Sequence, residues 1–167
     1  GEGAAGREHG GCRSGRRGGE DGGAGGTGGT RRAVAGPGVG GGGSEFVSSM
    51  DMRFGVIDRT IINQMEVPIG ILPGGSGTQR LPRLIGLGRA MEVVLGGGDL
   101  DAKTAERWGY LNRVFEADEV EDWVSNFAKR IAGFPVQAVR LAKAAVLNSD
   151  MPLEEGLKEA AFLFAQL

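Results

Sequence analysis

The chain has one cysteine, Cys12, and one histidine, His9, among its 167 residues. One cysteine cannot form an intramolecular disulfide, and zinc sites are usually built from several Cys and His ligands. We therefore expect no disulfide framework and no metal site. The formal net charge of −2 gives no overall basic field, so we also expect no nucleic-acid partner.

Long apolar runs are absent as well. A transmembrane helix needs about 20 consecutive apolar residues, and a signal peptide needs a hydrophobic segment close to the N-terminus. The sequence has neither pattern, so the default expectation is a cytoplasmic protein with no membrane partner. The length is enough for one domain with a hydrophobic core.

Large apolar residues are missing from the start of the chain, where Phe46 is the first. The first 43 residues hold 20 of the 33 glycines. We expect residues 1–33 to be disordered, because a Gly/Arg-rich segment buries too little to offset its chain entropy. Three interpretations stay open: a flexible tail, an Arg/Gly tail that binds RNA, and translation of GC-rich DNA in a shifted frame.

The rest of the chain is expected to form a mixed α/β core over 34–115 and a helical region over 116–167. A short strand is expected at 113–115. Apolar spacing predicts a helix over 44–54, with Phe54 on its inner face and Gly55 as its end. Further helices are expected at 76–85, at 102–108 with Asp101 as N-cap, from Asp118 and from Pro135. Two more are expected with named inward faces. The helix at 87–95 has Leu87, Met91, Val94 and Leu95 inward, and the helix from Pro152 has Leu153, Leu157, Ala160, Ala161 and Phe164 inward.

Two glycine turns and two carboxylates carry the candidate chemistry. The tract 40–43 leads into a predicted helix and Glu45, and Gly74 lies in a second tract before the next helix. A glycine turn that opens a helix exposes backbone N–H groups at the positive end of the helix dipole, where they can hold a developing oxyanion. With Glu66 as the second carboxylate, the pattern predicts acid–base chemistry on a carbonyl compound.

The order of these pieces resembles the crotonase (enoyl-CoA hydratase/isomerase) superfamily. The resemblance runs from about Val34 to Leu167 and covers the C-terminal part of that domain only. It is carried by Gly-Gly-Gly-x-Glu ending at Glu45, Gly-Thr-Gln-Arg-Leu-Pro-Arg at 77–83, and Ala-x-Glu-x-Val-Leu-Gly-Gly starting at Ala90. Residues 1–33 show no such resemblance.

The resemblance implies a partial ββα superhelix followed by a helical C-terminal trimerisation region. It implies a lyase of fatty acid metabolism that adds water to the 2,3-double bond of an enoyl-CoA thioester. Glu45 and Glu66 match the two catalytic carboxylates, Gly42 matches an oxyanion-hole N–H, and Gly74 matches an N–H that helps hold the water. CoA is part of the substrate, so no separate cofactor is expected, and the partners are an acyl-CoA and further copies in a homotrimer or a dimer of trimers.

The sequence departs from the family upstream of Gly40. The family takes a second oxyanion-hole N–H from an Ala-Gly-x-Asp-like loop, and the Gly/Arg-rich segment stands in its place here. We therefore expect an incomplete site, with the acyl-chain specificity left open. Two alternatives remain: a catalytically inactive assembly or interaction module, and an isomerase-type member of the superfamily.

Overall fold

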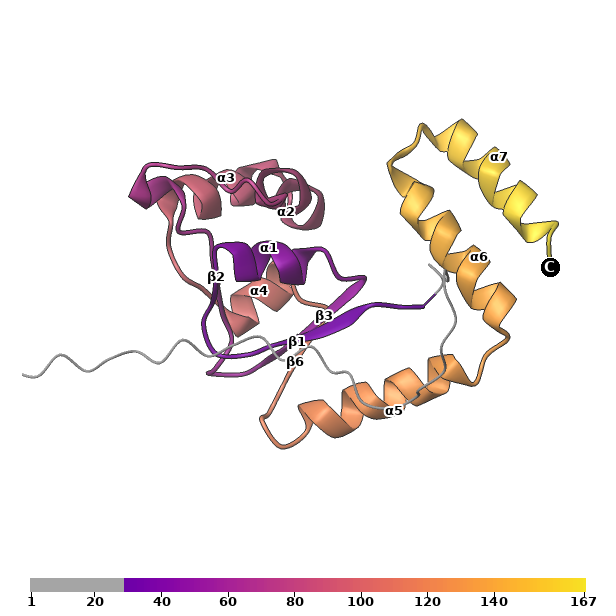
Figure 1. Ribbon diagram of the computed structural model, residues 1–167, viewed down its shortest axis with the longest axis horizontal. Coiled ribbons are helices and arrows are strands. Elements are labelled where there is room, and N and C mark those ends of the chain that lie inside the picture. Colours follow the sequence, from indigo (N-terminus) through magenta and orange to yellow (C-terminus); the bar gives the residue numbers. More distant parts are fainter. Residues whose placement is uncertain (1–28) are drawn as a thin grey trace, which may run out of the picture. The chain divides into compact units, whose positions relative to one another are not determined.

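A computed structural model describes residues 29–167 (Figure 1). Residues 1–28, which hold most of the segment expected to be disordered, lie outside the described residues. The described chain forms two compact units, residues 31–120 and residues 121–167 together with 29–30.

The first unit contains two small sheets. One has the order β1-β3-β6 with parallel neighbours, and the other has the order β2-β4-β5, in which β4 is parallel to β2 and antiparallel to β5. The strands are β1 (Arg32–Ala35), β2 (Val39–Gly40), β3 (Met52–Val56), β4 (Ile61–Asn63), β5 (Leu100–Asp101) and β6 (Arg113–Phe115). Twice in succession, the chain adds one strand to each sheet and then forms a helix. Strands β1 and β2 come before the helix at Gly42–Ser48, and strands β3 and β4 come before the 3-10 helix at Val67–Ile69.

Helices complete this unit and confirm the predicted mixed α/β class. They are α1 (Gly42–Ser48), the 3-10 helix η1 (Val67–Ile69), α2 (Gly77–Ile85), α3 (Leu87–Gly96) and α4 (Ala102–Trp108). Helix α1 contacts α2, and α2 contacts α3, so α1 lies between the strands and the α2–α3 pair (Figure 1). The predicted N-cap of α4 is confirmed, because Asp101 Oδ1 accepts the N–H of Thr104 at 2.9 Å.

A single apolar cluster joins the strands to these helices. Burying these side chains supplies the main favourable free energy of folding. The members are Ala33, Ala35, Val39, Val47, Ile62, Leu81, Ile85, Ala90, Val93, Leu100, Ala105, Tyr110 and Leu111.

The predicted helix over 44–54 is wrong in its second half, because α1 ends at Ser48. The hydroxyl of Ser48 donates to the carbonyl of Glu45 at 2.7 Å, and that of Ser49 donates to the carbonyl of Phe46 at 2.6 Å. Serine hydroxyls that bond nearby carbonyls compete with the helical backbone pattern and favour helix ends. Strand β3 begins four residues later, at Met52.

Phe54 and Gly55 therefore belong to strand β3 and not to a helix and its end. Phe54 is buried in the strand. A Cβ atom on Gly55 would lie 2.7 Å from Cδ1 of the buried Leu111, so a larger residue here would force Leu111 to move. A glycine that allows a close approach can thus be mistaken for a helix stop when only the sequence is known.

The inner face predicted for α3 is wrong except at Val94, which is partly buried against the core. Ala90 and Val93 are buried, whereas Leu87, Met91 and Leu95 are exposed. Helix α3 packs against both α2 and η1. The small side chain of Ala90 allows this close packing, so the larger residues point away from it.

The second unit is helical. It holds most of α5 (Val120–Ala132), together with α6 (Val136–Leu147), the 3-10 helix η2 (Asn148–Asp150) and α7 (Leu153–Phe164). Trp123 and Phe127 stack on α5 with ring centroids 5.0 Å apart, and α6 and α7 lie side by side, joined by η2 (Figure 1).

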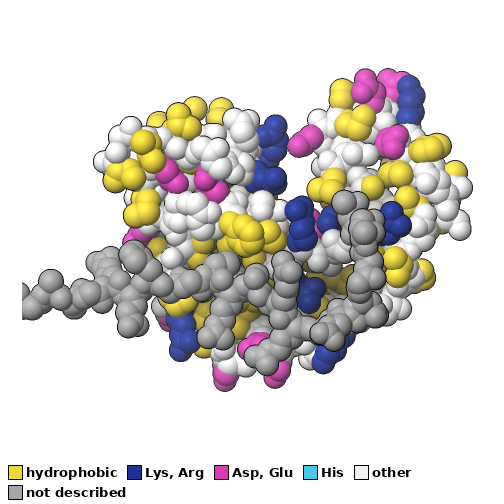
Figure 2. Space-filling model, viewed as in Figure 1, with side chains coloured by type: hydrophobic (Ala, Val, Ile, Leu, Met, Phe, Trp, Pro, Cys, Tyr) yellow, Lys and Arg dark blue, Asp and Glu magenta, His cyan; other side chains and the backbone are white. Residues whose placement is uncertain are grey.

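The inward face predicted for α7 is wrong for the single chain except at Ala160, which is partly buried, whereas Ala161 is exposed. Leu153, Leu157 and Phe164 are 79%, 61% and 76% exposed, because a helix pair shares only one face and these residues lie outside it. Figure 2 shows hydrophobic side chains on the surface of this helical unit. Over the described residues, none of the helices combines the length and the apolar character needed to cross a bilayer.

Candidate active site

Glu45 lies in the first turn of α1, and its carboxylate is held by the turn that opens α2. Oε2 accepts the N–H of Gly75 at 2.9 Å, and Oε1 accepts the N–H of Gly77 at 2.7 Å. The side chain is only 8% exposed. Hydrogen bonds to an ionised acceptor are stronger than neutral ones, and the N-terminus of α2 adds its positive dipole end. These contacts fix the direction of the carboxylate.

The glycines of this turn are needed because the carboxylate approaches the backbone. A Cβ atom on Gly75 would collide with Oε2 of Glu45, and one on Gly77 would lie 3.0 Å from Oε1. Between them, Ser76 has a φ of 111°, a backbone region that favours glycine. The turn is therefore shaped around the carboxylate at the expense of some backbone strain.

Glu66 lies at the start of η1 and is also only 8% exposed. Its Oε2 is buried without a hydrogen-bond partner among the described residues. A Cβ atom on Gly41 would lie 3.1 Å from Oε1 of Glu66, so this carboxylate approaches the backbone of the turn that opens α1. The described structure thus leaves Glu66 able to donate or accept a further hydrogen bond.

The two predicted glycines sit in these same turns. Gly42 is the first residue of α1, where a helix has no internal acceptor for its N–H groups. Gly74 precedes the glycine whose N–H binds Glu45. A Cβ atom on Gly74 would meet only the carbonyl of Leu72, at 3.9 Å. The roles of Gly42, Gly74, Glu45 and Glu66 in a reaction stay predictions.

A third buried polar side chain, Gln64, lies beside the turn. Its Oε1 has no hydrogen-bond partner among the described residues, and it would lie 3.2 Å from a Cβ atom on Gly77. Buried polar atoms without partners are uncommon and typically belong to sites that take water or a ligand. Residues 29–167 contain no group of three or more His, Cys, Asp or Glu residues arranged to hold a metal ion.

Comparison with known proteins identifies the family. The sequence model described as enoyl-CoA hydratase/isomerase matches residues 32–167. The chain belongs to the enoyl-CoA hydratase/isomerase family. This match confirms the predicted membership of the crotonase superfamily.

Named members of the enoyl-CoA hydratase/isomerase family show how much of the domain is present. A protein named "Probable enoyl-CoA hydratase" from Rhizobium meliloti (strain 1021) is 37% identical over 129 residues, which is 76% of this chain and 49% of the relative. The short-chain-enoyl-CoA hydratase of Clostridioides difficile is 37% identical over 124 residues, covering 74% of this chain and 79% of that protein. The Clostridioides difficile protein is covered to a larger share than the others. The chain spans about half the length of most of the curated relatives that it matches.

The fold of the enoyl-CoA hydratase/isomerase family is evident in three dimensions. The crystal structure of enoyl-CoA hydratase from Bacillus anthracis matches with a TM-score of 0.73 and 34% identity, covering 80% of this chain and 50% of that chain. The described residues therefore form part of the family's domain, and the mixed α/β fold of this part is confirmed.

Sequence reasoning missed the residues that hold Glu45 in this family member. The sequence indicates a glycine turn at Gly74-Gly75-Ser76-Gly77 but gives no link between the N–H groups of Gly75 and Gly77 and the carboxylate of Glu45. Only a local signal was present, namely three glycines around one serine just before a helix. The burial of Gln64 could not be predicted from the sequence, because a glutamine at the end of a strand is usually exposed.

Proposed function

We propose that the chain carries an enoyl-CoA hydratase-type site that adds water to the 2,3-double bond of an enoyl-CoA thioester. The observation that supports this best is the pair of buried glutamates, each lying against a glycine turn that opens a helix. Glu45 accepts two N–H groups from the turn before α2, and Glu66 lies against Gly41 before α1. A cytoplasmic location and a role in fatty acid metabolism belong to the same proposal.

The proposed reaction divides the proton transfers between the two carboxylates. One carboxylate takes a proton from water as the water oxygen bonds to the β-carbon. The electron pair of the double bond moves toward the thioester carbonyl, where an N–H donor stabilises the developing negative charge. The second carboxyl group then gives a proton to the α-carbon, so the sum of the steps is the addition of one water.

The unequal contacts of the two glutamates support an assignment of roles. Both oxygens of Glu45 accept one N–H donor each, which fixes the direction of the carboxylate, and each oxygen has a second lone pair that could take the proton from water. Glu66 has a buried oxygen with no partner in the described structure, which suits it to carry and deliver the second proton. Gly42 N–H is the proposed donor to the thioester oxygen, and Gly74 N–H is the proposed holder of the water.

The same proposal includes an incomplete site. An oxyanion hole usually offers more than one donor, and the resemblance assigns the second N–H to a loop upstream of Gly40. The chain spans about half the length of the curated relatives it matches. We therefore expect a lower rate from this chain than from a full-length relative.

The direct test is hydration of a short trans-2-enoyl-CoA by the purified chain, followed by the loss of the conjugated thioester absorbance. Glu45→Gln and Glu66→Gln keep the size of each side chain and remove its acid–base function. We expect each to lower kcat by about 100-fold or more. Glu92→Gln is the matched control, because Glu92 is exposed on α3. Equal rates for all three variants would refute the assignment of the two glutamates.

An isomerase reaction is the nearest competitor, because the matching family includes isomerases. It moves the double bond and adds no water. Mass analysis of the product separates the two, since hydration adds the mass of one water and isomerisation adds none. An isomeric enoyl-CoA as the sole product would replace the hydratase proposal.

A second proposed role is assembly through the helical unit. The exposed apolar side chains of α7, such as Leu153 and Phe164, are the supporting observation, because large exposed apolar surfaces usually mark interaction sites. The expected assembly is a homotrimer or a dimer of trimers, measured as the mass in solution by light scattering. A Leu153→Ser/Phe164→Ser chain is expected to be monomeric. A trimer that hydrates no enoyl-CoA would favour the inactive assembly module.

A further inference from the structure

Tyr110 connects α4 to the helix that carries Glu45. The ring is completely buried, and its hydroxyl donates to the carbonyl oxygen of Ser44 at 2.8 Å. The same phenol oxygen lies 3.1 Å from Oγ of Ser44. Because the phenol proton goes to the carbonyl, the Ser44 hydroxyl donates to the phenol in the arrangement that satisfies both groups. Ser44 directly precedes Glu45 in α1.

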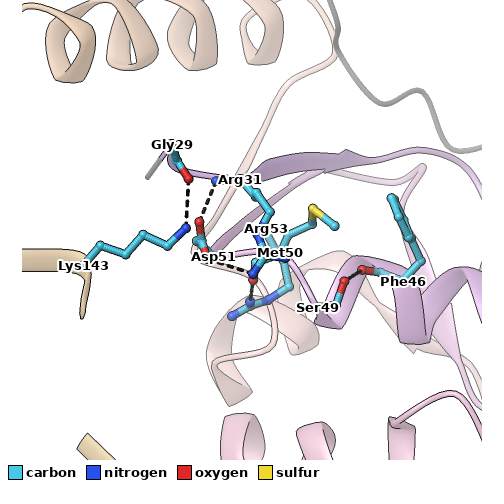
Figure 3. A network of polar contacts seen from close by, with 8 residues as sticks. All are labelled: Gly29, Arg31, Phe46, Ser49, Met50, Asp51, Arg53 and Lys143. Carbon is cyan, nitrogen blue, oxygen red and sulfur yellow. Dashed lines mark hydrogen bonds and ion pairs between the residues drawn. The ribbon is translucent and has the colours of Figure 1, made fainter. Parts of the chain in front are cut away.

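A buried arginine, Arg53, extends this contact to the segment that follows α1. Arg53 donates from Nε to the carbonyl of Tyr110 at 2.5 Å. Its Nη1 donates to the carbonyl of Met50 at 2.8 Å (Figure 3). Burial lowers the pKa of Arg53, while the charges of Tyr110 and Asp51 act in the opposite direction. The planar guanidinium makes these two bonds in fixed directions. Tyr110 is thereby bonded directly to Ser44 in the first turn of α1 and, through Arg53, to Met50 just after the end of α1.

Helix α1 needs such support because it has only seven residues. An isolated helix of that length is not stable in water. On one side it is held by Ser44 and Tyr110, and on the other the carboxylate of Glu45 binds the amides of Gly75 and Gly77. A small rotation of α1 would move Glu45 and the N–H of Gly42 together, since both belong to its first turn.

We propose that Tyr110 is a positioning residue that sets the rotation of α1, and thereby the placement of the Glu45 carboxylate and the Gly42 N–H. It acts through the carbonyl and hydroxyl of Ser44 and does not touch the substrate. The proposal rests on the proposed function, because it gives the reacting groups of that function their geometry.

The test compares Tyr110→Phe with the unmodified chain by NMR, using the backbone amide signals of Gly75 and Gly77 as reporters. These amides bind the Glu45 carboxylate, so their chemical shifts and hydrogen-exchange protection follow its position. We expect both signals to move in Tyr110→Phe and their protection to fall by about tenfold or more. Ser44→Ala keeps the bond from the Tyr110 hydroxyl to the Ser44 carbonyl, so we expect it to shift the Gly75 and Gly77 signals by less. If Tyr110→Phe does not fold, a shift of these two signals in Ser44→Ala supports the proposal, and the absence of a shift contradicts it.

Thr60→Val is the matched control. Thr60 is buried in the same unit, and its hydroxyl donates to the carbonyl of Ala35 at 2.6 Å, away from α1. Loss of this hydroxyl is expected to lower global stability by a similar amount and to leave the Gly75 and Gly77 shifts in place. Unmoved signals in Tyr110→Phe, or equal movement in Thr60→Val, would overturn the proposal.

A kinetic measurement separates this proposal from the proposed function. In a chain that hydrates enoyl-CoA, Tyr110→Phe is expected to lower kcat by about tenfold or more through misplacement of Glu45, with little change in KM. A raised KM with an unchanged kcat would contradict positioning. An unmodified chain that fails to hydrate enoyl-CoA would refute the proposed function, while the amide signals would still decide the role of Tyr110.

Discussion

Gly75→Ala is expected to displace the carboxylate of Glu45. A Cβ atom at this position would collide with Oε2 of Glu45, the oxygen that accepts the Gly75 N–H at 2.9 Å. The carboxylate must then move away from the turn, because the backbone at Gly75 is fixed by the start of α2. That movement breaks the bond to Gly75 and weakens the bond of Oε1 to Gly77.

The expected loss of stability follows from the bonds involved. A hydrogen bond to a charged group contributes about 1.5–3 kcal/mol. Alanine also restricts the unfolded chain more than glycine does, and this effect stabilises the folded state by about 0.4–1 kcal/mol. We therefore expect Gly75→Ala to lower the free energy of unfolding by about 1–2 kcal/mol, most of it through Glu45.

A double-mutant cycle isolates the part that passes through Glu45. In a Glu45→Ala chain the colliding carboxylate is absent, so the added Gly75→Ala is expected to be neutral or slightly stabilising. Urea unfolding of the four chains gives a coupling energy, with a common m-value as the check that the transitions are comparable. The coupling is expected to be about 1.5–3 kcal/mol.

Gly74→Ala is the matched control for this cycle, because a Cβ atom there meets only a carbonyl at 3.9 Å. Its effect on stability is expected to be within about 0.5 kcal/mol of zero, with or without Glu45. Additive effects of Gly75→Ala and Glu45→Ala would refute the view that the turn is shaped around the carboxylate.

Three further substitutions test other parts of the first unit. Ser76→Gly is expected to raise the free energy of unfolding by about 1 kcal/mol by relieving a φ of 111°, and a lower melting temperature would contradict this. Asp101→Ala is expected to lower the free energy of unfolding by about 1 kcal/mol, because helix α4 loses its N-cap. The N–H and hydroxyl of Thr104 lower the pKa of Asp101, so the folded chain favours the anion. The loss in free energy of unfolding caused by Asp101→Ala should therefore be complete above about pH 4 and become smaller as the pH falls through the lowered pKa. Urea unfolding at several pH values measures this loss. A loss that becomes larger in acid would contradict the prediction. Arg53→Met leaves the buried carbonyl of Tyr110 and the partly buried carbonyl of Met50 without the arginine donor, and we expect it to lower the free energy of unfolding by about 2–4 kcal/mol. Urea unfolding close to that of the unmodified chain would refute this.

The sequence was sufficient for the family and for the order of the main elements. The tract 77–83 and Glu45 carry a specific pattern, and a capping residue such as Asp101 acts locally, so the start of α4 follows from its own neighbourhood. Mixed α/β structure likewise follows from short apolar strands separated by helical spacing. These features depend on residues close together in the chain.

The errors concern features that depend on distant contacts. Phe54 fits a helical spacing and yet lies in a strand, because β3 pairs with β1 and β6 and this pairing is invisible locally. The inner face of α3 is set by its packing against α2 and η1. Glu45 meets its partners 30 and 32 residues later, so no local pattern could indicate that its carboxylate is held by Gly75 and Gly77.

The unequal bonding of the two glutamates has a consequence for how such a chain changes in evolution. Glu45 ties α1 to the turn before α2, so selection for folding alone retains it even after a reaction is lost. Glu66 keeps a buried oxygen without a partner in the described structure, which lowers stability by about 1–3 kcal/mol. Mutational drift without selection on the chemistry would therefore replace Glu66 first. Among descendants of such a site, Glu66 is thus the better marker of catalysis, whereas Glu45 also marks an intact fold.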